Sequence, residues 1–558
     1  MTDSDVLADS ETPVLIVGGS LVGLTTSLLL STYGVPNVVV ERHRGTAIHP
    51  RAASFHQRTM EVFRHAGIQQ TVEDAAATEF LQNGAIVAVE SLCGKELQYF
   101  YTSWNEGVED LSATSRLFIT QVGLEPLLRK AAHDRGATHH FGAEVLTVDQ
   151  DESGVTARVQ SRDGGDVHTI RARHLVAADG AHSSIREGLG IEMPGHGTAD
   201  CITIYFRADM REMIGDRNLS VIYVLHPEML GFFRFSFDRG SGFLSVFSVT
   251  DPDTGEHYDL GRDLPDDRAK TWVRLALGCA ADTPVEIDSV QHWEASASCA
   301  ASFRQGRIFL AGDSAHTMPP TGGWGGNTGV ADAHNLAWKI AMVEHGHADP
   351  ALLDSYDAER RPTALMTVEQ AYAIYAGRYA ERSSKSDTQE LAAPRPAEDI
   401  ELGAVYRSTA LCDQEIGSYG TGEQAATRNP REPGVPVGAR VPHLPLRRDG
   451  EVISIHDLCT DAFVLLAGPQ GRTWTDAVRG LADHDGLPLR GYTLGTGADL
   501  EVVDVEPEDA LGLPATGAVL IRPDGVLAWR AGDDVSDPEG GLRDALAVLL
   551  ARQAAAVG

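Results

Sequence analysis

Apolar and polar positions follow an α/β pattern at the start of this chain. An apolar, β-branched run over 12–17 stops at a glycine cluster, and an apolar helical stretch covers 24–30. A second apolar run, at 38–40, ends on Glu41. This strand–helix–strand unit predicts a parallel sheet, because parallel neighbours need a crossover connection between them.

The chain up to residue 380 extends this α/β domain and interrupts it with a second sheet. We expect helices over 125–132, 331–345 and 364–379, and strands over 145–148, 155–159, 174–178 and 307–310. Between residues 202 and 248, four strand-length runs alternate apolar and polar positions: ITIYF, SVIYVL, FFRFSF and FLSVFSV. Such alternation predicts a separate, mostly antiparallel sheet.

Beyond residue 382 the pattern changes twice. Residues 383–438 are rich in Ser, Pro, Glu, Gly and Thr, which predicts an irregular connector. Strand and helix alternate again after it, in runs such as FVLLAG, RGYTL and AVLIRPDGVLAWR. We therefore divide the chain into a first α/β segment (1–185), an inserted β-sheet domain (186–295), a return to the α/β domain with helices (296–382), the connector (383–438) and a C-terminal domain (439–558).

Charge and composition exclude several classes of function. The 558 residues carry a formal net charge of -33, which argues against binding to nucleic acid or to anionic membranes. No apolar stretch approaches the roughly 20 residues of a membrane helix, and the acidic start of the chain does not resemble a signal peptide. The six cysteines are scattered, without a C-x-x-C pair or Cys/His ligand spacing, so we expect no metal site. Together these features predict a cytoplasmic protein.

A glycine-rich turn follows the first predicted strand. It runs from Gly18 to Gly23, and Ser20 replaces the usual middle glycine of a dinucleotide-binding turn. In such turns the pyrophosphate lies at the N-terminus of the following helix. Glu41, 18 residues after Gly23, is placed to accept hydrogen bonds from ribose hydroxyls. Taken alone, the motif also fits a purely structural glycine turn.

Two further motifs follow predicted strands. Gly312 and Asp313 begin the segment GDSAHTMPPTGGWGGN, in which the aspartate can hold a polyol hydroxyl and the glycines allow a flat ring to approach the backbone. The N–H groups of the following helix can stabilise negative charge on that ring. Asp179 begins the segment DGAHSSIR, which has the form D-G-x-x-S-x-x-R.

These three motifs, in their order along the chain (18–23, 179–186 and 312–327), resemble the class A FAD-dependent aromatic hydroxylases, which have the para-hydroxybenzoate hydroxylase fold. The resemblance covers roughly residues 12–380. The segments HPRAASFHQRTMEVFRHAGI, GLEPLLRKAA, RIFLAGDSAHTMPPTGGWGGNTGVADAHNLAWKI and LLDSYDAERRP resemble its polyketide-tailoring branch, which includes aklavinone hydroxylase. The resemblance implies a Rossmann-like FAD-binding domain, an inserted β-sheet substrate domain and a thioredoxin-like C-terminal domain. Because that last domain lacks a C-x-x-C pair here, we expect it to be structural.

The resemblance also implies a set of cofactor-binding residues. The expected FAD contacts are Gly18, Gly23, Glu41, Arg42, Arg51, Gln121 and Asp313, with Gly322, Gly326 and Asn327 along the isoalloxazine edge. Asp179 and Arg186 inherit a mixed role in binding FAD and NAD(P)H. For each of these positions a helix cap or a surface ion pair is the alternative interpretation. His49 either forms a covalent flavin link or packs on the cofactor, and the sequence leaves both open.

The implied activity requires no catalytic triad, because the cofactor performs the difficult step. In this family NADPH or NADH reduces FAD, O2 forms a C4a-hydroperoxyflavin, and one oxygen atom is transferred to an aromatic substrate. Tyr223 and Arg378 are the catalytic candidates, since the polyketide branch has a tyrosine and an arginine near the substrate at these positions. A core tyrosine and a helix-surface arginine are the alternatives. A homodimer is also compatible with the resemblance.

Other functions are also compatible with the sequence. The same chemistry could oxidise a polyketide ketone or quinone by Baeyer–Villiger or ring-opening reactions, or inactivate an aromatic antibiotic. A non-enzymatic FAD protein that sequesters a polyketide is a rival of a different class. The absence of a W-x-W-x-I-P segment argues against a flavin halogenase. The sequence does not choose between NADPH and NADH, nor does it name the substrate or the carbon attacked.

Overall fold

A parallel sheet forms the centre of the computed structural model, which describes residues 7–48, 53–251, 254–379, 391–412, 426–503, 507–533 and 535–552. β1 (Ser10–Val17) lies between β2 (Asn37–Glu41) and β10 (Val167–Ala177). The sheet continues in parallel with β7 (Thr138–Phe141) and β17 (Ile308–Leu310), and antiparallel strands β8 (Ala143–Gln150), β9 (Val155–Ser161) and β16 (Arg304–Gln305) complete it. Both faces of β1 are covered, so its run of Val, Leu and Ile side chains is apolar without alternation. The predicted parallel sheet is confirmed.

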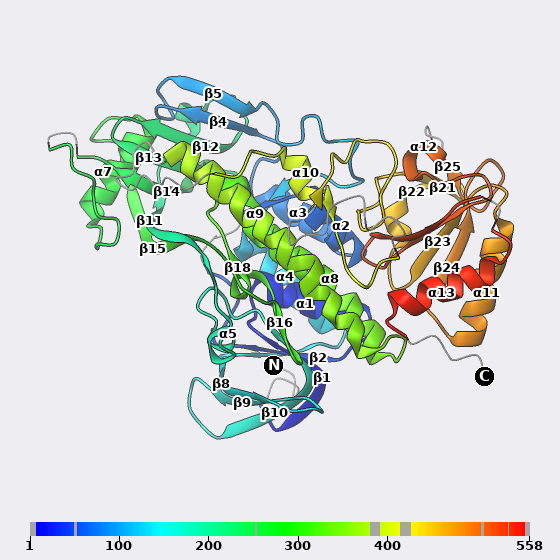
Figure 1. Cartoon of the computed structure of the whole chain (residues 1–558). Helices are drawn as coiled ribbons and strands as arrows, with labels where there is room; N and C mark the ends of the chain where they lie inside the picture. Colours follow the sequence, from blue (N-terminus) through cyan, green and yellow to red (C-terminus); the bar gives the residue numbers. More distant parts are fainter. Residues whose placement is uncertain are drawn as a thin grey trace.

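Long helices cover this sheet (Figure 1). α1 (Leu21–Thr32) packs against α4 (Gln121–Asp134) and α8 (Trp324–Glu344), and α9 (Ser355–Tyr379) runs across the molecule beside α8. Gly329 permits the close packing of α8 on α1, since a Cβ there would lie 2.5 Å from the Val22 side chain. The predicted helices over 331–345 and 364–379 exist, but both begin earlier than the pattern indicated.

The inserted sheet has eight strands, in the order β18-β15-β11-β14-β13-β12-β4-β5. Its predicted strands are β11 (Gly195–Arg207), β12 (Leu219–His226), β13 (Met229–Phe235) and β14 (Ser241–Val249). The pattern did not indicate β15 (Glu286–Cys299), β18 (His316–Thr317), β4 (Ala85–Val89) or β5 (Glu96–Tyr101). β4 pairs in parallel with β12, so part of the segment 1–185 joins this sheet, and the other pairs are antiparallel. α7 (Asp266–Leu277) packs its apolar side on the sheet.

The C-terminal domain has a four-stranded sheet in the order β24-β23-β26-β27. β23 (Phe463–Ala467) and β24 (Leu489–Thr493) are parallel, whereas β26 (Ala518–Ile521) and β27 (Leu527–Ala531) are antiparallel to their neighbours. α11 (Arg472–Asp485) and α13 (Pro538–Leu549) pack together beside this sheet. One parallel and two antiparallel strand pairs in this order are the arrangement that a thioredoxin-like domain requires.

Shorter elements complete the chain. They are β3 (Ser54–Phe55), α2 (Gln57–His65), α3 (Gln69–Glu79), β6 (Leu117–Phe118), α5 (Ser184–Gly188), α6 (Arg211–Ile214), α10 (Ala397–Glu401), β19 (Ala404–Val405), β20 (Ala426–Thr427), β21 (Pro445–Arg448), β22 (Glu451–Ser454), β25 (Glu501–Val502) and α12 (Pro507–Leu511). Short 3-10 turns cover Gly312–Ser314, Thr321–Gly323, Pro350–Asp354 and Ile455–Leu458. α10, β19 and β20 give the described part of the connector more regular structure than its composition predicts.

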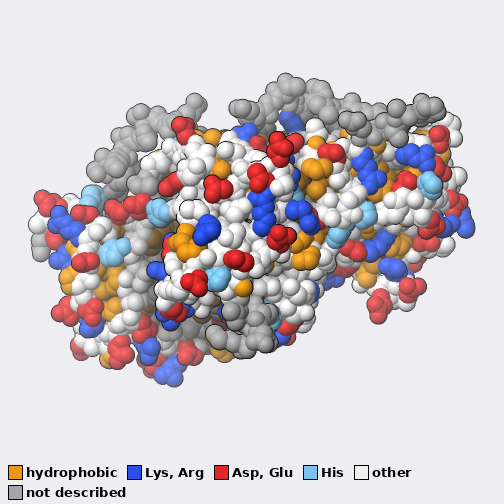
Figure 2. Space-filling view, turned by 90° about the horizontal axis from the view of Figure 1, so that it is seen from below, with side chains coloured by type: hydrophobic (Ala, Val, Ile, Leu, Met, Phe, Trp, Pro, Cys, Tyr) orange, Lys and Arg blue, Asp and Glu red, His pale blue; other side chains and the backbone are white. Residues whose placement is uncertain are grey.

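One hydrophobic core extends from the central sheet into the C-terminal domain. Trp338 of α8 is fully buried and meets Phe463 of β23 edge to face, with ring centroids 5.8 Å apart. Acidic and basic side chains are interspersed on the face drawn in Figure 2, so the net charge is not gathered into one patch there. Among the described residues, no helix is long and apolar enough to cross a membrane.

Candidate active site

The glycine-rich turn lies between β1 and α1, as predicted. Gly18 has φ 108° and a Cβ there would lie 2.1 Å from the Ala178 carbonyl oxygen, so this position requires glycine. A Cβ at Gly23 would lie 1.9 Å from the Gly18 carbonyl oxygen. These two glycines bring the start of α1 against the ends of β1 and β10. The first turn of α1 contains no acidic residue of its own, but Glu125 of α4 accepts from the Leu21 N–H at 3.0 Å, so its carboxylate lies at the start of the helix.

Ser20, the departure from the usual pattern, has a specific partner. Its backbone is extended (φ -99°), so no glycine is needed at this position. Its hydroxyl donates to Glu125 Oε1 at a distance of 2.5 Å, and Gln121 Nε2 donates to the same oxygen at 3.0 Å. The other Glu125 oxygen accepts from the Ala47 N–H at 2.7 Å. Glu125, which the motif search did not single out, therefore joins α4 and the loop after β2 to the dinucleotide turn.

Glu41 lies at the end of β2 with its carboxylate directed at the turn. Oε2 accepts from the Gly19 N–H at 2.6 Å, and Oε1 accepts from the His43 N–H at 2.7 Å. Its neighbour Arg42 is exposed. Arg51, and with it His49, lies outside the described residues.

Asp179 and Arg186 connect two of the motifs. Arg186 is buried, and its guanidinium donates to the carbonyl oxygens of Ala181 (3.0 Å) and Ser314 (3.3 Å), so it joins the D-G segment to the Gly312–Ser314 turn. Asp179 follows β10, and its Oδ1 is buried with no hydrogen bond among the described residues. Burial raises the pKa of this carboxyl, although hydrogen bonds from Ser183 and Ile185 oppose the rise.

Hydrogen bonds from Gly312 and Ser314 fix the Gly312–Ser314 turn, while the Asp313 side chain is exposed. The Gly312 N–H donates to Asp332 Oδ2 at 3.1 Å, and His316 Nε2 lies 2.7 Å from the same oxygen. Ser314 Oγ donates to the Ala177 carbonyl oxygen at 2.6 Å. The turn thus presents Asp313 beside the Gly18 turn, because β17 and β1 both flank β10 in the central sheet.

The expected isoalloxazine edge, around Gly322 and Gly326, lies where α8 begins. Gly322 and Gly323 have positive φ (82° and 68°), a conformation that other residues rarely adopt. Asn327 Oδ1 accepts from the His56 N–H at 3.0 Å and from Thr59 Oγ1 at 2.7 Å. Asn327 Nδ2 donates to the carbonyl oxygens of Ser54 (3.1 Å) and Gly323 (2.7 Å). Asn327 therefore joins this edge to β3 and α2.

A buried polar cluster that the sequence reading missed lies behind this edge. His56 Nδ1 is 3.6 Å from Glu401 Oε1, and Arg116 Nε donates to Glu401 Oε2 at 3.0 Å. Arg116 also lies 4.9 Å from the centre of the Trp104 ring. Burial raises the pKa of Glu401 to about 7, while Arg116 opposes the rise. Glu401 belongs to the connector, whose polar composition did not indicate a buried charge.

A second buried cation, Arg234 of β13, joins the inserted sheet to the residue that precedes β3. Its guanidinium lies 4.0 Å from the centre of the Phe80 ring and 3.9 Å from that of Phe118. Nη1 donates to the Ala53 carbonyl oxygen at 3.1 Å. Burial lowers the pKa of Arg234 to about 9, and the nearby Glu79 opposes this change.

Aromatic side chains gather on the inserted sheet beneath α9. Phe232 contacts Tyr223 (ring centroids 6.0 Å apart) and Phe247 (5.9 Å), and Phe247 contacts Trp293 (6.2 Å) and Tyr375 of α9 (6.3 Å). The structure therefore places Tyr223 within an aromatic wall whose other four members were not singled out from the sequence. Arg378 is on α9, one turn beyond Tyr375, but its side chain lies outside the described part of the chain.

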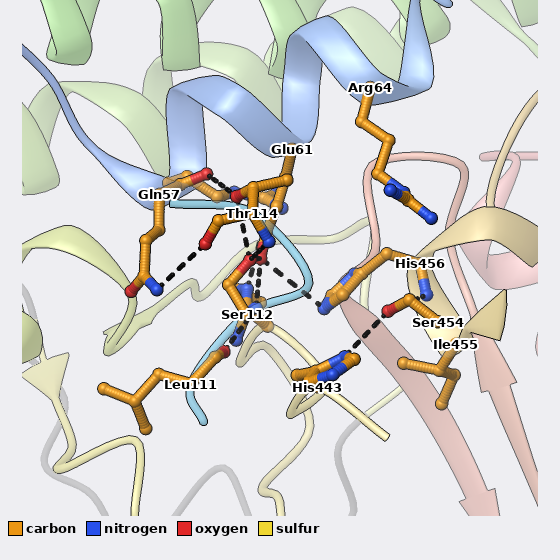
Figure 3. Close-up of polar contacts among 12 residues, drawn as sticks. Gln57, Glu61, Arg64, Leu111, Ser112, Thr114, His443, Ser454, Ile455 and His456 are labelled. Carbon is orange, nitrogen blue, oxygen red and sulfur yellow. Dashed lines mark hydrogen bonds and ion pairs between the residues drawn. The ribbon is translucent and has the colours of Figure 1, made fainter. Parts of the chain in front are cut away.

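The C-terminal domain contacts α2 through a second buried carboxylate. Figure 3 shows Glu61 directed from α2 towards Ser112 and His456. Arg440 and Arg58 donate to Glu61, and Ser112 Oγ donates to Glu61 Oε1 at 2.6 Å. Although burial acts in the opposite direction, Arg440 and His456 hold the pKa of Glu61 well below its usual value.

Comparison with known proteins assigns the family. The FAD binding domain family matches residues 11–371, and the family described as aromatic-ring hydroxylase, C-terminal, matches residues 435–552. The chain belongs to the FAD-dependent aromatic hydroxylases. This hydroxylase is 46% identical over 549 residues to a 4-methyl-5-nitrocatechol 5-monooxygenase of Burkholderia sp, covering 98% of both chains. It is 37% identical to a tetracenomycin A2 monooxygenase-dioxygenase of Streptomyces glaucescens, covering 99% of both.

Solved structures agree with this assignment. A ternary complex of aklavinone-11 hydroxylase with FAD and aklavinone superposes with a TM-score of 0.88 at 35% identity, covering 98% of this chain and 100% of that one. The expected fold, flavin cofactor and monooxygenase class of the hydroxylase are thereby confirmed.

The residues of the hydroxylase fit FAD. The closely packed turn from Gly18 to Gly23 suits the pyrophosphate, and Glu41 provides ribose acceptors at the end of β2. Asp179 Oδ1 is a buried acceptor without a donor among the described residues, adjacent to the turn that presents Asp313. The start of α8 has no acidic residue in its first turn, so its N–H groups suit an electron-rich ring edge.

Proposed function

We propose that this hydroxylase uses NADPH or NADH and O2 to hydroxylate a polycyclic aromatic substrate of the polyketide type. When bound and reduced, FAD supplies the activation of O2 for transfer of one oxygen atom to an electron-rich ring. The aromatic wall of Tyr223, Phe232, Phe247, Trp293 and Tyr375 is the observation that carries the proposal. Such rings favour a flat, apolar substrate through offset and edge-to-face contacts.

Individual residues then have distinct tasks. Gly18, Gly23, Gln121, Glu41, Arg42 and Arg51 bind the adenosine diphosphate part of FAD, and Asp313 binds the ribityl chain. Gly322, Gly326 and Asn327 shape the edge beside the isoalloxazine ring, and Asp179 and Arg186 serve both FAD and the nicotinamide nucleotide. The Tyr223 hydroxyl stabilises the phenolate form of the substrate, which raises the electron density of the ring, and Arg378 is the second candidate for substrate contact.

A small nitrated catechol is the second candidate substrate. It is favoured by the 46% identity to the 4-methyl-5-nitrocatechol 5-monooxygenase, which exceeds the 37% identity to the tetracenomycin A2 enzyme. The aromatic wall suits either kind of ring. The two candidate substrates differ in size and in the ring substituent that the new oxygen replaces, so analysis of the products distinguishes them.

The deciding experiment is aerobic NADPH oxidation by the yellow holoenzyme with two substrate panels, polycyclic phenols and quinones in one and nitrocatechols in the other. Under ¹⁸O₂ we expect a polycyclic substrate to stimulate oxidation and to gain one labelled oxygen as a new phenol. Stimulation by nitrocatechols alone would support the second candidate and refute the first. A labelled lactone or ring-opened product from a ketone would refute aromatic hydroxylation, and a failure of every substrate to stimulate oxidation would favour a sequestering protein.

A further inference from the structure

The β26–β27 turn of the C-terminal domain inserts an arginine into the FAD-binding domain. Arg522 follows β26, and its side chain is 0% exposed. Its guanidinium donates to both oxygens of Glu359 on α9, at 2.7 and 2.9 Å, and to both oxygens of Asp524 at 3.0 and 2.6 Å. These two bidentate pairs, one with Glu359 and one with Asp524, fix the orientation of the guanidinium plane.

Glu359 also accepts hydrogen bonds from two further segments. Its Oε2 accepts from Lys339 Nζ (2.9 Å) and Asn335 Nδ2 (2.6 Å), both on α8, and its Oε1 accepts from Ser408 Oγ (2.6 Å) in the connector. With Arg522 included, Oε1 of this carboxylate accepts two hydrogen bonds and Oε2 accepts three. Glu359 ties α8, α9, the connector and the C-terminal domain together at one point.

The residue after Glu359 leads from this point to the flavin site. Arg360 Nε donates to Asp332 Oδ1 at 2.8 Å, and Arg360 Nη2 donates to the Thr328 carbonyl oxygen at 3.2 Å. The other oxygen of Asp332 holds the Gly312 N–H and lies 2.7 Å from His316 Nε2. Gly312 immediately precedes Asp313. A continuous set of hydrogen bonds and one peptide link thus joins Arg522 to the turn that presents Asp313.

The network is balanced in charge and closed to solvent. It contains three cations and three carboxylates, none of which is more than 3% exposed: Arg522, Arg360, Lys339, Glu359, Asp332 and Asp524. A buried set of this kind has little freedom, because displacing one member leaves another charge unpaired in the interior. Such rigidity is useful where a backbone turn must hold a cofactor in a fixed position.

We propose that the C-terminal domain holds the Gly312–Ser314 turn in its FAD-binding position, with Arg522 as the positioning residue that acts through Glu359, Arg360 and Asp332. The inference rests on the proposed contact between Asp313 and FAD. It gives the C-terminal domain a task in flavin binding although the domain contains no paired cysteines and lies beyond the connector.

FAD affinity of the full-length holoenzyme tests the proposal. Dilution releases flavin, whose fluorescence gives the dissociation constant for wild type, Arg522→Met and Arg522→Lys. We expect Arg522→Met to raise this constant at least tenfold and Arg522→Lys to recover part of the loss, because lysine restores the charge without the second bidentate pair. Asp332→Asn, which leaves the contacts of the C-terminal domain intact, should also weaken FAD binding.

Arg440→Met is the matched control, since Arg440 also joins the C-terminal domain to the FAD-binding domain but pairs with Glu61. If Arg440→Met lowers Tm by as much as Arg522→Met does, it should still change the FAD dissociation constant less than threefold. Equal weakening by both arginine variants, or unchanged FAD binding in Arg522→Met, would overturn the proposal. Asp313→Ala distinguishes the proposed Asp313–FAD contact from the proposed role of Arg522. Unchanged FAD affinity in Asp313→Ala would refute the contact. Weaker FAD binding in Asp313→Ala, with unchanged binding in Arg522→Met, would refute only the role of Arg522.

Discussion

Glu401 of the connector pairs with Arg116, the residue before β6, at 3.0 Å, and both side chains are only 1% exposed. The pair lies behind the glycine-rich edge of the flavin site, next to His56. Burial nevertheless raises the pKa of Glu401 to about 7, so desolvation outweighs the attraction of Arg116. A segment that links two domains thus contributes a titrating group to the interior of the FAD-binding domain.

The first prediction concerns the pH dependence of stability. Between the ordinary pKa of 4.5 and the folded value of about 7, the folded protein binds more protons at Glu401 than the unfolded chain does. Stability from this group is therefore present below pH 4.5 and is lost as pH rises towards 7, by up to roughly 3 kcal/mol. Glu401→Gln should flatten the Tm profile of the holoenzyme between pH 5 and 7.5.

The charged and titratable neighbours of Glu401 are Arg116, His56 and Glu398. His56 stays neutral in this range, because burial and then Arg116 lower its pKa to about 3. Glu432→Gln, at an exposed position of the same connector, is the control and should leave the profile unchanged. A Glu401→Gln profile parallel to that of the wild type would show that Glu401 is ionised throughout.

Much of the cofactor half of the molecule was predictable from local sequence. The run 12–17, the turn to Gly23 and the run ending on Glu41 interact with near neighbours in the chain, so their pattern carries the structure. The three motifs meet because the strands that precede them are neighbours in one parallel sheet. The starts of α8 and α9 were less predictable, since tertiary packing extends both helices.

The remaining features depend on contacts between distant segments. β4 is an apolar run without alternation, and its partner β12 begins more than a hundred residues later, at Leu219. Glu401 belongs to a five-residue helix in a polar segment, so only its contact with Arg116 reveals its burial. Arg522 interrupts an apolar run and has the sequence pattern of an exposed turn residue, although it is fully buried. Local patterns cannot show which distant carboxylate pairs with such an arginine.

A second prediction tests the two ends of the FAD site. Glu41→Ala and Asp313→Ala each remove acceptors for cofactor hydroxyls, at about 1–3 kcal/mol per charge-assisted bond, so FAD affinity should fall roughly 5- to 150-fold. The measurement is flavin occupancy after purification, followed by FAD titration. Asp134→Ala, which removes an exposed carboxylate paired with Lys130, should purify fully yellow. Unchanged affinity in both site variants would refute the assignment of these positions.

A third prediction concerns Tyr223 on the aromatic wall. Tyr223→Phe keeps the ring contacts with Phe100 and Phe232 but removes the hydroxyl. If the hydroxyl polarises the substrate, hydroxylation should slow roughly 10- to 100-fold at little change in KM, and more NADPH oxidation should yield hydrogen peroxide. Tyr205→Phe, on β11 of the same sheet, should behave as wild type. Full coupling and an unchanged rate in Tyr223→Phe would assign the tyrosine to packing.

A fourth prediction addresses the thioredoxin-like domain. Cys459 is the one cysteine between residues 439 and 558, and its thiol is buried beside the Ile455 carbonyl oxygen. Burial raises the pKa of Cys459 to about 12, so the reactive thiolate is scarce at neutral pH. Cys459→Ser should therefore retain wild-type turnover and flavin reduction by NADPH, with only a modest decrease in Tm from burying a hydroxyl. Cys459→Ala, which buries no polar group, is the companion variant. Loss of turnover in both variants, at wild-type Tm and FAD content, would mean that Cys459 takes part in the chemistry. The C-terminal domain would then have a redox role, which the absence of a second cysteine between residues 439 and 558 argues against.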